Sequence, residues 1–192
     1  MIKVVIEAGH SEAPKDFSRE DEINLLVSQA IQAKIFDETK AGNNKDIVSV
    51  IIPKILRGRK LDLMDKVYFA NDLKADLLLS VHCNWSSNKE ANGFNIYYDD
   101  KKTELAARSR RFAEILDGKM KGYNFTSWGT AVDIDTHTAP GNLAICSYSR
   151  MPAVLIELGF LSNERDAVEL EKADTQALIA RAHYEAIKNY FL

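Results

Sequence analysis

Short apolar runs alternate with longer amphipathic segments along this chain. Each run is brief enough to be a buried strand, and we predict strands at 2–6, 47–52, 77–82, 93–98, 143–146 and 153–158. The amphipathic segments repeat their apolar residues at helical spacing, which predicts helices at roughly 19–38, 60–74, 103–121 and 174–191. Strands that alternate with helices favour an α/β fold: a single domain over 1–192, with a mainly parallel, twisted sheet of about six strands flanked by helices.

The first and last predicted helices have recognisable starts. Ser18 is the expected N-cap of the first, and Asp21 three residues later completes a pattern similar to a capping box. Asp174 is the expected cap of the last helix. His183 lies within that last helix, and we expect it at the surface or at the edge of the core, not in a ligand set.

A polar and aromatic stretch at 122–142 interrupts the alternation. Loops of this length in a compact domain are usually functional or disordered, and the aromatic residues of the stretch argue against simple disorder. Two interpretations stay open. The stretch either contacts substrate or acts as a lid, with His137 as a candidate contact, or it is a structural loop that covers the end of the sheet.

Ionisable side chains stand where three of the predicted strands end. Glu7 and His10 follow the first strand, His82 ends the third, and Glu157 follows the apolar run 153–156. The carboxyl ends of parallel strands are where α/β proteins place their chemistry. A carboxylate or an imidazole at such a position also needs a partner or a cleft. We therefore predict a functional site at this edge of the sheet.

Two of these side chains are candidate metal ligands. Two histidines and a carboxylate form the ligand set of many catalytic zinc sites, because three protein ligands leave a fourth position open for water. His10 or His82 alone is more simply explained as a hydrogen-bonded core histidine. Their shared position at strand ends favours a common site.

The third ligand is expected from the first helix, where Glu20 and Glu22 compete. At about 100° per residue, Glu20 lies on the apolar stripe that includes Ile23 and Val27, whereas Glu22 is turned away from it. A carboxylate on a buried face is costly without a cation or hydrogen-bond donors. Glu20 is therefore the predicted ligand, together with His10 and His82, of one Zn²⁺ ion per chain.

Glu157 has a different predicted role. It is presented from the most apolar segment of the chain, so desolvation should raise its pKa toward the range of a general base or acid. The alternative is a buried glutamate that forms a structural ion pair. Glu7 either accepts an N–H from a ligand histidine or is a surface charge, and Asn84, just past His82, either contacts substrate or caps its loop.

Composition and charge argue against several other functions. A chain of 192 residues with 46% hydrophobic content can bury a full core, and a net charge of −3 offers no general attraction to nucleic acid or anionic lipid, although local patches remain open. Cys83 and Cys146 lie in apolar runs without metal-ligand spacing and are expected to be buried thiols. No segment has membrane-spanning length, and the start does not match a secretory signal.

At these residues the chain resembles the zinc-dependent N-acetylmuramoyl-L-alanine amidases of the "amidase 3" type, which cut the bond between peptidoglycan glycan and its stem peptide. The resemblance runs over nearly the whole chain, and its most specific block is 151–163. It is carried by Gly9-His10, by Glu20 four residues before Asn24, by Phe69-Ala70-Asn71, by Ser80-Val81-His82-Cys83-Asn84, by Gly93-Phe94-Asn95-Ile96-Tyr97-Tyr98 and by Met151-Pro152-Ala153-Val154-Leu155-Ile156-Glu157-Leu158-Gly159-Phe160-Leu161-Ser162-Asn163.

The resemblance implies that His10, Glu20 and His82 bind zinc, that Glu157 is the catalytic glutamate and that peptidoglycan is the substrate. Two alternatives stay open: an inactive peptidoglycan-binding or regulatory module of the same fold, and a zinc peptidase or deacetylase acting on another amide. We expect a protein made in the cytoplasm that acts on the wall after release, such as a phage or prophage endolysin, or a fragment of an exported protein.

Overall fold

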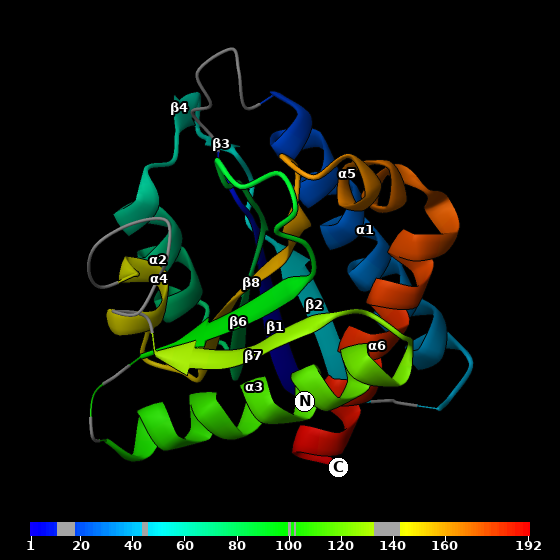
Figure 1. The fold of residues 1–192 in the computed structure, drawn as a ribbon. Helices are drawn as coiled ribbons and strands as arrows, with labels where there is room; N and C mark the ends of the chain where they lie inside the picture. Colours follow the sequence, from blue (N-terminus) through cyan, green and yellow to red (C-terminus); the bar gives the residue numbers. More distant parts are fainter. Residues whose placement is uncertain (11–17, 44–45, 100, 102, 133–142) are drawn as a thin grey trace.

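A computed structural model describes residues 1–10, 18–43, 46–99, 101, 103–132 and 143–192 (Figure 1). Its elements follow one another along the chain as β1 (Ile2–Ala8), α1 (Ser18–Lys40), β2 (Ile47–Ile51), β3 (Ile55–Leu56), β4 (Arg59–Lys60), α2 (Leu63–Asp72), β5 (Leu77–Asn84), β6 (Phe94–Tyr98), α3 (Glu104–Gly122), β7 (Ser127–Val132), α4 (Ala144–Ser147), β8 (Ala153–Phe160), α5 (Glu164–Glu171) and α6 (Ala173–Phe191).

The main sheet confirms the predicted α/β class. Its six strands are ordered β2-β1-β5-β8-β6-β7. β2, β1, β5 and β8 run parallel, whereas β6 pairs antiparallel with β8 and parallel with β7. The carboxyl ends of β1, β5 and β8 therefore meet at one edge of the sheet. This is the edge at which the sequence predicted a functional site.

Helices cover both faces of this sheet. One core lies between the sheet and α1, α3 and α6, where Val27, Phe112 and Ile187 are fully buried. A smaller core on the other face holds Val67 of α2 and Ile145 of α4. Alternate strand residues supply the two cores, since Val4 and Ile6 of β1 face the first while Val5 faces the second.

Two assignments made from the sequence, one strand and one loop, differ in the structure. The run 143–146 lies in and next to the short helix α4, because four apolar residues without alternation suit either structure. Part of the stretch 122–142 forms the edge strand β7, so the prediction of one continuous loop is wrong, and residues 133–142, including His137, lie outside the described residues. The hairpin β3–β4 and helix α5 were not predicted at all.

The start of the last helix and its histidine also differ from expectation. Asp21 forms an ion pair with Lys54 at 2.7 Å, and because the side chain of Ser18 lies outside the described residues, the capping box at the start of α1 stays a prediction. α6 begins one residue before Asp174. His183 is fully buried in the core, where its Nδ1 lies 2.8 Å from the carbonyl oxygen of Ile179. It is not a surface residue.

Both cysteines are buried free thiols, as predicted, although Cys146 lies in α4 and not in a strand. Among the described residues, no helix combines the length and the apolar character needed to cross a bilayer.

Candidate metal centre

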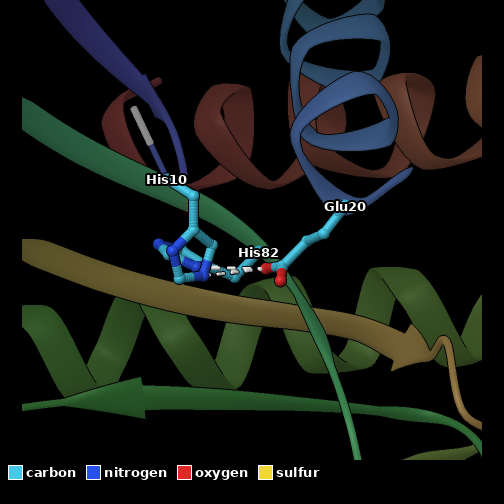
Figure 2. A group of neighbouring side chains, drawn as sticks. All are labelled: His10, Glu20 and His82. Atoms are coloured by element: carbon cyan, nitrogen blue, oxygen red, sulfur yellow. Dashed lines mark ion pairs between the residues drawn. The ribbon is translucent and has the colours of Figure 1, made fainter. Parts of the chain in front are cut away.

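Three side chains from distant parts of the chain converge at the carboxyl edge of the sheet. His10 follows β1, His82 lies near the end of β5, and Glu20 lies in the first turn of α1 (Figure 2). Oε1 of Glu20 is 3.3 Å from Nε2 of His10 and 3.4 Å from Nδ1 of His82. One ligand atom from each residue lies within 4.8 Å of the others. The structure thus brings together the three residues that were predicted as metal ligands.

Backbone geometry aims both histidines at this point. His10 adopts a positive φ of 52°, a left-handed conformation that is uncommon for residues other than glycine and that often accompanies a functional constraint. Gly9 packs directly against the ring of His82: a Cβ on residue 9 would lie 2.5 Å from both ring nitrogens. Only glycine leaves room there for the imidazole.

Glu20 is buried with its carboxylate held by donors. Oε1 accepts the backbone N–H of Cys83 at 3.1 Å and the side-chain amide of Asn24 at 3.3 Å. Burial by itself raises the pKa of this carboxyl group, but hydrogen bonds from His10, His82 and the backbone outweigh it and hold the pKa well below its ordinary value. Helical periodicity correctly placed Glu20 inward, while Glu22 is exposed.

A buried chain of polar groups contacts His82 on the Nε2 side of its ring, away from Glu20. Oε2 of Glu7 lies 3.5 Å from Nε2 of His82 and accepts the hydroxyl of Ser80 at 2.5 Å, while Oε1 forms an ion pair with Lys66 at 2.6 Å. Burial opposes the charge on Glu7, but His82 and Lys66 lower its pKa to about 2. With Nε2 facing an ionised carboxylate, Nδ1 is the nitrogen of His82 that faces Glu20 and is available to a metal ion.

These carboxylates also change the proton affinity of His82. Burial alone lowers the pKa of the ring, but hydrogen bonds to Glu20 and Glu7 raise it to about 10. In the metal-free protein the imidazole therefore carries a proton at neutral pH. Because a metal ligand must be deprotonated, metal binding releases that proton.

Glu157 stands beside the cluster on the next strand. Its Cα is in register with His82 across the parallel pair β5–β8, so the two side chains emerge on the same face. Oε2 of Glu157 is buried and has no hydrogen-bond partner among the described residues. Burial, with the nearby charge of Glu20, raises its pKa to about 7 despite the opposing effect of His82 and His10. Within the described part of the chain, no structural ion pair neutralises this glutamate.

The donor set fits a zinc ion. Two imidazoles and a carboxylate are typical zinc ligands, and two Zn–ligand bonds of about 2.0–2.1 Å at a tetrahedral angle separate their ligand atoms by about 3.4 Å. The distances from Oε1 of Glu20 to the two histidine nitrogens, 3.3 and 3.4 Å, match this spacing.

Other polar residues near the site include some that the sequence did not single out. Oδ1 of Asn84 accepts the backbone N–H of Trp85 at 2.8 Å, so its side chain takes part in the turn after β5. Lys66, Ser80 and Asn24 hold the carboxylates of Glu7 and Glu20, and no role was predicted for them. A signal existed for Lys66: it is a cation at a position that the helical pattern of α2 buries.

A mainly parallel α/β sheet carries a His–Glu–His cluster at its carboxyl edge, beside a carboxylate oxygen that has no hydrogen-bond partner among the described residues. Metal-dependent hydrolases use ligand sets of this kind. Comparison with known proteins gives the family. Residues 4–189 match Amidase_3, N-acetylmuramoyl-L-alanine amidase, and the chain belongs to this family, which confirms the resemblance seen in the sequence.

Individual relatives agree with this assignment. The chain is 29% identical to the N-acetylmuramoyl-L-alanine amidase LytC of Bacillus subtilis (strain 168) over 90% of its own length, and it spans 31% of that longer protein. The crystal structure of an N-acetylmuramoyl-L-alanine amidase from Clostridium difficile 630 is similar with a TM-score of 0.80 at 25% identity, covering 98% of this chain and 96% of that one. The catalytic domain of the amidase CwlV from Bacillus (Paenibacillus) polymyxa var. colistinus gives a TM-score of 0.74 at 27% identity, covering 99% and 98%.

Proposed function

We propose that this chain is a zinc-dependent N-acetylmuramoyl-L-alanine amidase, which hydrolyses the amide bond between N-acetylmuramic acid and L-alanine in peptidoglycan. The family supports the reaction, and the convergence of His10, Glu20 and His82 on one point carries the proposal of zinc. In this proposal Nε2 of His10, Oε1 of Glu20 and Nδ1 of His82 hold the ion, and Glu157 is the catalytic residue.

Zinc held at this site would supply Lewis-acid polarisation of the scissile carbonyl group and a water molecule of lowered pKa. The residues of the chain have separate tasks. Glu157, whose Oε2 has no hydrogen-bond partner among the residues that the structure describes, accepts the proton of the attacking water and then donates it to the departing amino group of L-alanine. A pKa raised to about 7 suits both steps, because the group can take up and release a proton near neutral pH.

Glu7 has a positioning task in this proposal. Its carboxylate faces Nε2 of His82 and keeps the proton on that nitrogen, which leaves Nδ1 free to bind the metal. Lys66 and Ser80 hold this carboxylate in place through the ion pair and the hydrogen bond described above. The bound histidine therefore cannot rotate without breaking contacts that are buried.

Two other functions make different predictions. An inactive peptidoglycan-binding module would need neither all three candidate ligands nor a buried glutamate beside them, yet His10, Glu20, His82 and Glu157 are all present. A zinc peptidase or deacetylase would use the same groups on a different amide, so the reaction products have to distinguish it. Hydrolysis by the proposed amidase frees amino groups of L-alanine in purified sacculi without forming new reducing sugars.

The proposal is tested by measuring zinc content and sacculus digestion in the same set of variants. Glu157→Ala should retain about one zinc per chain and lose hydrolysis by about 10²- to 10⁴-fold, the usual contribution of a general base. His82→Ala and Glu20→Ala should lose both zinc and activity. Glu22→Ala is the matched control for Glu20→Ala, because Glu22 lies two residues away on the exposed side of α1. Near-normal activity of Glu157→Ala would show that the assigned base is wrong.

A further inference from the structure

The hairpin β3–β4 concentrates positive charge in an otherwise acidic protein. Residues 54–60 read Lys-Ile-Leu-Arg-Gly-Arg-Lys, with four cations and no acidic residue, while the whole chain has a net charge of −3. Ile55 pairs with Lys60 and Leu56 with Arg59. Arg57 and Gly58 form the two-residue turn, and both have the positive φ, 52° and 78°, that this kind of tight hairpin turn requires.

The side chains of the hairpin point into solvent. Ile55 is 58% exposed and Leu56 is 41% exposed, so the hairpin contributes little to either core. Two of the cations are neutralised: Lys54 pairs with Asp21 and Arg59 with Asp65, each at 2.7 Å. Arg57 and Lys60 are exposed and form no ion pair within the described part of the chain. They leave two uncompensated positive charges beside exposed apolar surface.

The hairpin stands next to the candidate metal centre. The chain leaves the sheet where the backbone N–H of Ile52 donates to the carbonyl oxygen of Ile6, near the end of the strand that leads to His10. Lys54, at the base of the hairpin, is bound to Asp21, the residue that directly follows Glu20. Figure 1 shows β3 and β4 at the same end of the molecule as the start of α1.

We infer that the hairpin 54–60 binds the acidic peptide portion of the substrate, with Arg57 and Lys60 facing its carboxylates and Ile55 and Leu56 contacting its small apolar side chains. The inference rests on the proposed function and adds to it the part of the substrate that this surface recognises. Three extended residues span at most about 10 Å, so the hairpin tip lies within about that distance of Lys54, which is bound to Asp21 beside Glu20.

Charge complementarity selects an acidic peptide over the other parts of the wall. The glycan carries hydroxyl and acetamido groups, which draw little from two exposed cations, whereas free carboxylates on a stem peptide are attracted to them. The net charge of −3 of the whole chain gives no such attraction. Local positive charge therefore matters most where the peptide must approach the site, and its effect should weaken as salt screens it.

The test measures binding without turnover, using Glu157→Gln protein loaded with zinc and two muramyl tripeptides, one with free carboxylates and one with these groups amidated. In low salt, adding Arg57→Glu and Lys60→Glu should weaken binding of the acidic ligand by about tenfold or more and change binding of the amidated ligand by less than about twofold. Arg57→Gln with Lys60→Gln should give a smaller loss in the same direction.

The matched control is Arg108→Glu with Lys40→Glu. Both cations are exposed. Arg108 lies on α3, and Lys40 lies at the far end of α1, about 30 Å from Glu20 along that helix. The control should leave binding of both ligands unchanged. Urea unfolding of each variant checks that the fold is intact.

Equal binding of the acidic ligand with and without the charge reversal would overturn the inference, even if the wild-type enzyme digests sacculi. A hairpin variant that loses attachment to phosphatidylglycerol vesicles but keeps its affinity for the acidic ligand would also overturn it, in favour of a lipid surface. Failure of the proposed function is a separate result: the zinc-loaded wild type would not hydrolyse sacculi. A charge-dependent loss of ligand binding would still support the role of the hairpin.

Discussion

Replacing Gly9 by alanine tests whether the packing beneath His82 sets the geometry of the metal centre. A Cβ on residue 9 would lie 2.5 Å from each ring nitrogen of His82, whereas ordinary contact begins at 3.4 Å, so the ring must retreat by about 0.9 Å. Zinc–ligand distances stay within about 0.2 Å of their preferred values. The displaced Nδ1 would therefore leave bonding distance, and the contact between His82 and Glu7 would be disturbed as well.

We expect Gly9→Ala to weaken zinc binding by about 10- to 100-fold, the range seen when groups that orient a metal ligand are removed. Affinity is measured by competition with a chelator of known strength, and activity on sacculi should fall in parallel at limiting zinc. Gly118→Ala in α3 is the matched control, because a Cβ there meets no atom within 4 Å. If Gly9→Ala binds zinc within twofold of the wild type, the packing argument is refuted.

Two further predictions concern buried charge. Lys66→Met leaves the Glu7 carboxylate buried without its ion-pair partner and should lower the free energy of unfolding in urea by about 3 kcal/mol. The control is Lys40→Met at an exposed position. A loss of less than about 1 kcal/mol for Lys66→Met would contradict a stabilising role of the buried pair. Burial lowers the pKa of His183 from 6.5 to about 4. The unfolded chain therefore binds a proton that the folded chain excludes, and stability present above pH 6.5 is lost as the pH falls toward 4. Metal-free wild type should lose roughly 2.5 kcal/mol more than His183→Leu between pH 7 and pH 4.5, and parallel pH slopes of the two proteins would show this to be wrong.

Much of the fold was predictable because its elements carry their own signals. The strands at β1, β5 and β8 are apolar runs, and α1, α3 and α6 repeat their apolar residues at helical spacing, so each was located to within a few residues. The strand predicted at 143–146 was wrong because this segment carries no such signal. Four apolar residues suit a strand or a helix equally, and only packing against the second core selects the helix. β7 was missed because an edge strand need not be apolar.

The same division applies to the candidate site. The sequence by itself determined the inward direction of Glu20, because a helix has one period and the apolar stripe of α1 identifies its buried side. It also placed His10, His82 and Glu157 at strand ends, where a parallel sheet gathers them. These conclusions need only local geometry and the class of fold.

Only the tertiary structure decided which atoms meet. Glu7 binds Lys66 across 59 residues and Ser80 across 73, and these contacts depend on strand order and on the placement of α2, which no local pattern specifies. The same holds for Gly9, whose missing side chain matters only because the ring of His82 from β5 lies against it. Contacts between distant segments follow from how the elements pack together, and so they become visible only in the folded chain.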